Sequence, residues 1–427
     1  MTATAPFLTP CLAALLCGVG SIGAAQAQTA DPQTGGLVMR FGLTLGAAAQ
    51  SNRTLDINNP GNSTEIFTDL SFGISSETRT QALTFDLDGR LRTLDAPAGI
   101  FADQGLTAPS AALVYTLKGA TARLNLSARY SETDLSDTSL VIDEDDTFTI
   151  LTGDATRRRA VLEARHDWRQ DTRARFGAFV RYEDVSYRDG VATDVDGSNL
   201  SDSQRLTFGT SATLDLSTAA ELAITLSYSV FEEDGVANDR ETWSLGNTLT
   251  LDRPLGDVTL RFDVTDIEEG SRLSATVGRT YETARATFSG DIGVAREVTG
   301  QTVLIGSAGI NYPLPRGALS FGLSRQVASS NTQDEERLNT QVNFGYQHNL
   351  TPLSAISLEG IFAQVTDTSS DTTYRDATIS ATYTRTLTKN WNMDTGLRHR
   401  FSNDDGIGTA RSNEVFFNLR REFFTRF

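Results

Sequence analysis

Apolar and polar residues alternate one by one along most of the chain. Between residues 121 and 131, the even-numbered residues from Ala122 to Tyr130 are apolar, whereas those between them are Arg, Asn or Ser. The same alternation runs through 258–264 and 376–384. A β-strand projects successive side chains to opposite faces, so each segment has one apolar and one polar face. A helix would scatter these apolar residues all round, so the pattern predicts strands.

The alternation recurs too often for a soluble sandwich with a single core. The candidate strands are 37–49, 65–76, 81–92, 110–118, 121–131, 158–168, 173–183, 203–216, 220–231, 242–252, 258–264, 271–279, 284–295, 302–312, 318–327, 337–348, 355–365, 376–384, 390–401 and 412–427. Most have about ten residues, the length that a tilted strand needs to cross a bilayer. Segment 271–279 is short. Because single-chain barrels of this kind have an even number of strands, losing it would also remove a partner and lower the strand count by two. We therefore expect an all-β fold, a single transmembrane antiparallel up-and-down β-barrel of about 18–20 strands.

Short and long connections alternate between these segments. Pro and Gly favour tight turns at 253–256, 313–317, 349–352 and 388–390. Longer polar connections lie at 50–63, 93–107, 132–156, 188–202, 329–336 and 402–411. Short periplasmic turns and longer extracellular loops are typical of outer-membrane barrels.

The N-terminus has the features of a cleaved signal peptide. An apolar stretch from Cys11 to Ala25 ends in Ala25-Gln26-Ala27, which places small residues at a cleavage site. No Lys or Arg precedes it, and the alternative is a strand of a soluble core. We expect a signal peptide at 1–27, a short periplasmic segment at 28–35 and the barrel at 36–427. Later in the chain no apolar run reaches the roughly 20 residues of a spanning helix.

The C-terminal segment carries a candidate assembly signal. Phe417, Leu419, Phe423 and Phe427 share the apolar face of the last predicted strand, and the chain ends on Phe427. An aromatic last residue preceded by apolar residues at alternate positions resembles the signature that the barrel assembly machinery recognises. We expect that machinery to be a partner.

Charge bears on what the barrel interior does. The 427 residues carry a formal charge of −17, with 37 basic and 54 acidic residues, which argues against a nucleic-acid partner. A mean hydropathy of −0.25 is compatible with a barrel, whose wall needs only every second residue to be apolar. If the apolar positions face lipid, the alternate ones face the lumen. The densest charged group on them comprises Arg159, Arg165, Arg173, Arg175 and Arg181 with Glu163 and Glu183.

Two interpretations of this group stay open. The charges can filter solutes by sign and size, as a constriction or an anion-attracting wall. They can also merely hydrate the interior and hold the strand register. The acidic runs 143–146, 232–234, 334–336 and 404–405 are either solvated loop charge or bridge through divalent cations to lipopolysaccharide.

Residues for other chemistry are scarce. His166, His348 and His399 have no Ser or Cys arranged beside them as a nucleophile, and no phosphate- or dinucleotide-binding glycine motif occurs. We expect no enzyme, no cofactor and no metal site. The stretch before residue 36 is too short for a globular plug, which disfavours a TonB-dependent receptor.

The stretches 67–92, 231–256 and 396–406 resemble those of alphaproteobacterial outer-membrane proteins of the β-barrel porin type. This resemblance implies a barrel, a signal peptide, and a location in the outer membrane among lipid and lipopolysaccharide. It implies no substrate. We expect a passive porin-like channel for small hydrophilic solutes. The alternative is a non-conducting structural or surface-interaction barrel that uses its long acidic loops.

Overall fold

The computed structural model describes ten stretches of the chain: 36–97, 105–137, 140–142, 148–194, 198–236, 239–283, 285–329, 336–367, 372–405 and 408–427. The expected signal peptide at 1–27 and the segment at 28–35 lie outside these residues, as does the acidic run 143–146. Within these stretches, no helix is long and apolar enough to span a membrane.

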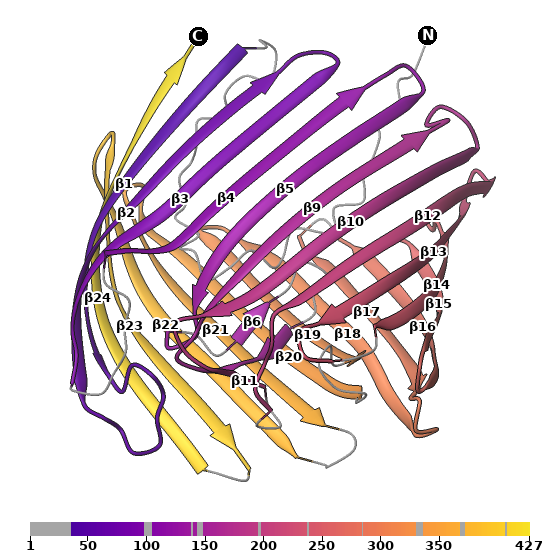
Figure 1. The fold of residues 1–427 in the computed structure, drawn as a ribbon. Coiled ribbons are helices and arrows are strands. Elements are labelled where there is room, and N and C mark those ends of the chain that lie inside the picture. Colours follow the sequence, from indigo (N-terminus) through magenta and orange to yellow (C-terminus); the bar gives the residue numbers. More distant parts are fainter. Residues whose placement is uncertain are drawn as a thin grey trace.

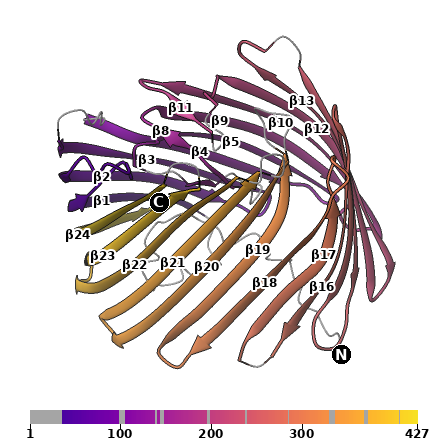
Figure 2. The same cartoon turned by 90° about the horizontal axis from the view of Figure 1, so that it is seen from below.

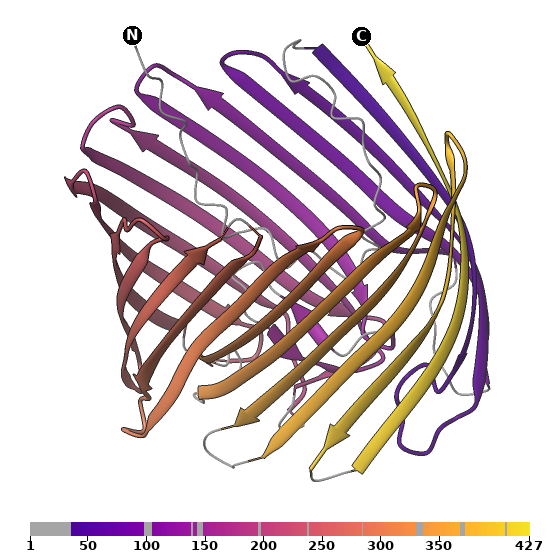
Figure 3. The ribbon, with the colours of Figure 1, turned by 180° about the vertical axis from the view of Figure 1, so that it is seen from behind.

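Twenty antiparallel strands form one closed sheet (Figure 1). They are β1 (Gly36–Ser51), β2 (Asn62–Glu77), β3 (Gln81–Asp95), β4 (Gly105–Lys118), β5 (Ala122–Asp134), β9 (Thr156–Trp168), β10 (Ala174–Arg188), β12 (Ser203–Ser217), β13 (Ala220–Glu233), β14 (Arg240–Leu251), β15 (Val258–Ile267), β16 (Gly270–Glu282), β17 (Thr287–Arg296), β18 (Thr302–Leu314), β19 (Gly317–Ser329), β20 (Glu336–Thr351), β21 (Ser354–Asp367), β22 (Thr373–Thr388), β23 (Trp391–Asp404) and β24 (Gly408–Arg426). Each pairs with the next along the chain, and β24 pairs with β1 from Val38↔Arg426 to Gln50↔Glu414. Figures 2 and 3 show the wall curving round to this closure. The predicted up-and-down barrel is confirmed.

All the predicted strands are present, including the short candidate 271–279, which is the centre of β16 and pairs on both sides. The four tight turns are also confirmed. They connect β14 to β15, β18 to β19, β20 to β21, and β22 to β23. The beginning of β1 and the end of β24 lie at the end of the barrel where these turns are (Figure 1). The long loops lie at the opposite end.

The outer face of the wall is apolar. Leu162, Ile292, Ile379 and Leu397 are 53%, 58%, 61% and 60% exposed, although each is large and apolar. Such exposure is costly in water but favourable against lipid chains, and it recurs at every second position, as in membrane barrels. Gly209 of β12 leaves space for the aromatic ring of Phe179 on the neighbouring strand β10, since a Cβ at position 209 would lie 2.1 Å from that ring.

Two long loops fold toward the interior instead of simply extending outward. The connection from β5 to β9 contains β6 (Leu140–Ile142), β7 (Phe148–Ile150) and β8 (Thr152–Gly153), and β6 pairs with β7. The connection from β10 to β12 contains β11 (Ala192–Thr193), which pairs with β8. We call these the β5–β9 loop (135–155) and the β10–β12 loop (189–202). Figure 1 shows β6 and β11 at the long-loop end.

The β5–β9 loop reaches across the barrel to the far wall. Ile150 is 3% exposed and forms a buried cluster with Ala363 and Val365 of β21, against which Leu140 and Tyr374 also pack. Seven strands, β4 to β1 and β24 to β22, separate β5 from β21 along the ring. Ala363 and Val365 alternate with the outward Leu358 position and therefore face inward. Apolar side chains occur on this inner face because the loop covers them.

Candidate functional site: the charged inner wall and its inward loops

The predicted arginines on β9 and β10 lie on the face opposite the exposed apolar residues, and the structure pairs them with acids. Arg159 Nε lies 2.6 Å from Glu183 Oε1, and Arg181 Nη2 lies 3.5 Å from Glu183 Oε2. Arg165 Nε lies 3.0 Å from Asp167 Oδ1. Glu163 is the cross-strand neighbour of Arg181. The guanidinium charges of Arg159, Arg165 and Arg181 are therefore compensated within the wall.

The remaining two arginines lie at the tight-turn end. Arg175 forms ion pairs with Asp215, at 2.8 Å, and with Glu221. Arg173 precedes β10 and is exposed in the turn from β9. The seven predicted residues thus spread over the height of the barrel, and the structure does not gather them into one ring.

A tighter charged cluster, which the sequence did not reveal, holds the base of the β5–β9 loop. The Asp137 carboxylate forms ion pairs with Arg53 of the β1–β2 loop and with Arg92 of β3, whose side chains are 4% and 2% exposed. Arg400 of β23 donates from Nη1 to the Asp137 carbonyl oxygen at 2.5 Å. Arg92 also binds Asp134, at 2.9 Å. Burial of both guanidinium groups makes these pairs far less screened than surface pairs. We call this group the Asp137 cluster.

The β10–β12 loop is held by a buried pair on the far wall. Arg337 Nη1 of β20 lies 2.8 Å from Asp194 Oδ1, and the two side chains are 6% and 5% exposed. A third loop, 297–301, docks on the same strand. Glu336 Oε2 accepts from the backbone N–H of Val298 at 2.7 Å. Burial and the neighbouring Glu336 carboxylate raise the pKa of the buried Glu297.

Together the two long loops narrow the lumen at the long-loop end. Each begins on the β5–β12 side of the ring and contacts β20 or β21. Their own apolar residues, Leu135, Leu151, Ala155 and Ala192, form a second buried cluster. This small core gives the paired loops a packed structure of their own rather than that of a solvated loop.

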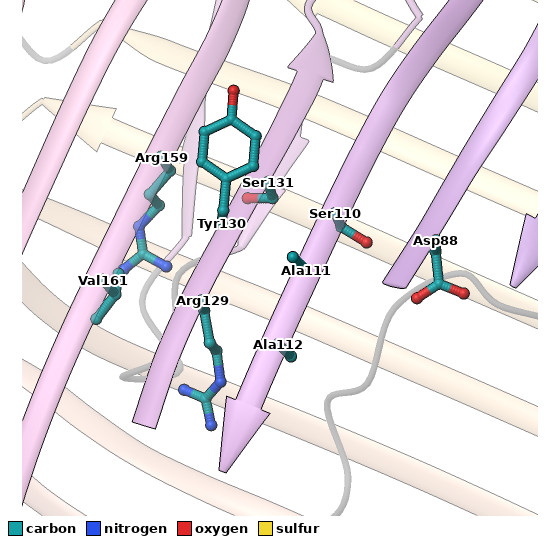
Figure 4. A pocket seen from close by; sticks show the side chains of 9 residues that line it. All are labelled: Asp88, Ser110, Ala111, Ala112, Arg129, Tyr130, Ser131, Arg159 and Val161. Carbon is teal, nitrogen blue, oxygen red and sulfur yellow. The ribbon is translucent and has the colours of Figure 1, made fainter. Parts of the chain in front are cut away.

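A pocket of about 190 Å³ lies in the inner wall where β3, β4, β5 and β9 adjoin (Figure 4). Asp88, Ser110, Ser131 and Arg159 are cross-strand neighbours in one row. In Figure 4, Arg129 and Arg159 stand on one side of the small residues and Asp88 on the other. The other lining residues are Ala111, Ala112, Tyr130 and Val161. We call this the wall pocket.

A β-bulge adjoins the wall pocket. Ser110 pairs with Asp88 and Thr107 pairs with Arg90, so Ala108 and Pro109 together oppose the single residue Gly89. Ala108 has φ +47°, a left-handed conformation that a residue with a Cβ adopts at a cost of about 1–2 kcal/mol. Pro109 has no N–H to give to the ladder, and within sheets proline is found at such bulges. Bulges re-aim the side chains around them and are enriched next to functional sites.

The histidines do not converge. His166 stacks on Trp168 with ring centroids 5.8 Å apart, His348 stacks on Tyr346 at 6.3 Å, and the ring of His399 lies 2.8 Å from Asn413 Oδ1. In the part of the chain that the structure describes, no three His, Cys, Asp or Glu side chains group so as to hold a metal ion.

The candidate assembly residues lie along the seam that closes the barrel. Phe417, Phe423 and Phe427 are exposed, and the backbone N–H of Phe427 donates to the carbonyl oxygen of Leu37 on β1 at 2.9 Å. Phe423 contacts Phe41 across the seam, with centroids 5.9 Å apart. Leu419 faces Leu45 in the same register.

Solved structures share this architecture. The siderophore receptor PirA from Acinetobacter baumannii is 9% identical, with a TM-score of 0.53, over 91% of this chain and 81% of that chain. The FrpB iron transporter from Neisseria meningitidis is 10% identical, with a TM-score of 0.51, over 92% and 82%. The ferric enterobactin receptor PfeA in complex with BCV-L6 is 10% identical, with a TM-score of 0.51, over 90% of this chain and 81% of that chain. No family model and no curated protein sequence matches the chain. The chain therefore has an outer-membrane β-barrel fold.

Proposed function

We propose that the protein lies in the bacterial outer membrane and forms a passive channel for small hydrophilic solutes. In this proposal lipid covers the outer face, lipopolysaccharide surrounds the long loops, and the barrel assembly machinery inserts the chain. The channel is porin-like, and no enzymatic step takes part. The proteins named above are a siderophore receptor, an iron transporter and a ferric enterobactin receptor, and a shared fold alone does not bring these roles to this chain.

The observation that carries the proposal is the contrast between the two faces of the wall. A barrel of about 20 strands is too wide for its own side chains to fill. Its inner face presents paired charges of both signs, such as Arg159–Glu183 and Arg175–Asp215, which favour water. The β5–β9 loop then crosses this wide lumen at one end. A wet lumen narrowed by an inward loop favours selection of solutes by size over free passage.

Proteoliposome swelling tests the channel proposal. Liposomes containing the refolded chain, residues 28–427, are placed in isotonic solutions of uncharged sugars of increasing size. The proposal predicts rapid swelling with small sugars and a cut-off as the sugars grow. Liposomes with heat-denatured protein serve as the control. A folded barrel that supports no swelling with any sugar would refute the channel.

A non-conducting surface-interaction barrel is the second candidate, and the loop contacts favour it. The β5–β9 loop is anchored at both ends of its crossing, by the Asp137 cluster and by Ile150 against Val365. If those contacts seal the lumen, the same swelling experiment gives no response with any sugar. Binding of purified lipopolysaccharide to the loops then becomes the function to measure.

A further inference from the structure

We infer that the wall pocket is a binding site for a small zwitterionic solute, one that carries a carboxylate and an ammonium group. This inference rests on the channel proposal and names the solute class that its lumen would recognise.

The row places opposite charges at the two ends of a floor of small residues. Neighbouring strands lie about 4.8 Å apart, so Asp88 and Arg159, three strands apart, have backbones separated by about 14 Å. Ser110 and Ser131 lie between them and are short. A gap of this kind in a charged wall leaves room for a solute, with hydroxyl groups at its base.

Arg129 provides the cationic side that is open to the lumen. It lies in the next inward row, beside Ala112 and Val161, and its side chain is exposed. Arg159, in contrast, is buried, with its side chain 10% exposed. Guanidinium groups bind carboxylates through parallel hydrogen bonds, so Arg129 is the residue that we assign to the carboxylate of the solute.

Asp88 provides the anionic side. It lies across the small residues from Arg129, as Figure 4 shows, and a carboxylate there can accept from an ammonium group. Because an arginine and an aspartate both line the pocket, a solute with a single charge is attracted by one of them and repelled by the other. A zwitterion satisfies both. Electrostatic pairing of this type gives specificity through the repulsion of wrong partners.

The bulge indicates that the pocket is built and maintained. Ala108 keeps its strained φ of +47°, and Pro109 interrupts the ladder where an uninterrupted pairing would be more stable. Because of the extra residue, the even-numbered positions of β4 face inward from Ser110 onward, whereas before the bulge the odd-numbered Thr107 faces inward. Thr107 is 4% exposed, and its hydroxyl group donates to the carbonyl oxygen of Arg90 at 3.3 Å. Ser110 therefore lies at the edge of a step in the wall.

The volume fits a small amino-acid-like molecule. A water molecule occupies about 30 Å³ of liquid, so about 190 Å³ accommodates a solute of roughly six or seven non-hydrogen atoms. The probe that we choose is 4-aminobutyrate. Butyrate and butylammonium are its matched controls, since each keeps the carbon chain and only one of the two charges.

The test is saturation-transfer NMR on the refolded barrel in detergent micelles, because it needs no ion conduction. We expect saturable binding of 4-aminobutyrate, with butyrate and butylammonium at least about tenfold weaker. Arg129→Ala and Asp88→Asn should each weaken binding about tenfold. Arg123→Ala is the matched control: this arginine faces inward on the same strand, outside the pocket, and its loss should leave binding unchanged.

Three results would overturn the site: no saturable binding to the wild type, equal binding of butyrate, or equal effects of Arg129→Ala and Arg123→Ala. Heat-modifiable migration of each variant on gels establishes that it is folded. Swelling of proteoliposomes reports separately on the channel. Binding without swelling would refute the channel and leave the site, and swelling without binding would do the reverse.

Discussion

Replacing Asp137 by Asn should release the β5–β9 loop without unfolding the wall. The substitution removes the charge that Arg53 and Arg92 share, whereas Arg53 keeps Glu65 at 2.8 Å and Arg92 keeps Asp134 at 2.9 Å. Removing one partner of a fully buried ion pair lowers stability by about 3–5 kcal/mol. The Asp137 side chain is 31% exposed, and its arginine partners keep other carboxylates nearby. We therefore expect the substitution to lower the free energy of opening the β5–β9 loop by about 2–3 kcal/mol.

Native-state hydrogen exchange measures this cost directly. At 1.36 kcal/mol per factor of ten, 2–3 kcal/mol raises the opening equilibrium of the loop by about 30- to 150-fold. The amides of Leu135 and Asp154, which donate to Ala155 and Val191, should exchange faster by that factor. Amides at the centres of β1 and β24 should be unaffected.

The matched control for this experiment is Asp171→Asn, which changes an exposed aspartate in the tight turn after β9. It should leave loop exchange unchanged. If Asp137→Asn alters the exchange of Leu135 and Asp154 by less than about threefold, the Asp137 cluster does not hold the loop.

Three further perturbations follow from the structure. Phe427→Ser should reduce the amount of heat-modifiable barrel in the outer membrane, whereas Leu397→Ser, at another exposed outer position, should not; equal amounts would remove the assembly role. Ala108→Gly should be neutral to about 1 kcal/mol stabilising in urea unfolding, because glycine tolerates the positive φ, and Ala108→Val should be destabilising; the reverse order would contradict the strain. The raised pKa of Glu297 means that the docked loop 297–301 favours the protonated carboxyl, so its protection from exchange should fall as pH rises above about 4.5. Glu297→Gln should abolish that dependence, and an unchanged pH profile in this variant would show that another group titrates.

The wall was predictable because alternation is a local property. Each strand has a two-residue period, and tight turns such as 313–317 carry their own Pro and Gly signals. Even the short candidate 271–279 paired as expected, since its partners β15 and β17 fix its register. Local pattern was enough for the whole ring.

The inward loops were not predictable in the same way. A long polar connection such as 132–156 has the same composition whether it extends outward or folds back. What directs it inward is pairing between residues far apart in the chain: Arg400 and Asp137 are separated by 263 positions. One local signal was available, because 356–365 carries apolar residues on both faces, and its inward Ala363 and Val365 had to be covered by something.

The candidate site shows the same division. Alternation placed the arginines of β9 and β10 on the inner face together with Glu183, which pairs with Arg159 and Arg181. It could not identify Asp215 and Glu221 as the partners of Arg175, since both lie on other strands. The wall pocket depends on a bulge that shifts the register of β4. Pro109, immediately before a predicted strand, was the sequence signal for it.

Single-channel conductance of the wild type and of Asp137→Asn in a planar bilayer tests whether the protein has a conducting lumen that the β5–β9 loop narrows. For such a lumen we expect stable ohmic steps from the wild type, and larger or more variable steps from the variant because its loop leaves the lumen more often. Folded barrels that give no steps in either form, or steps of the same size and noise in both, would contradict it.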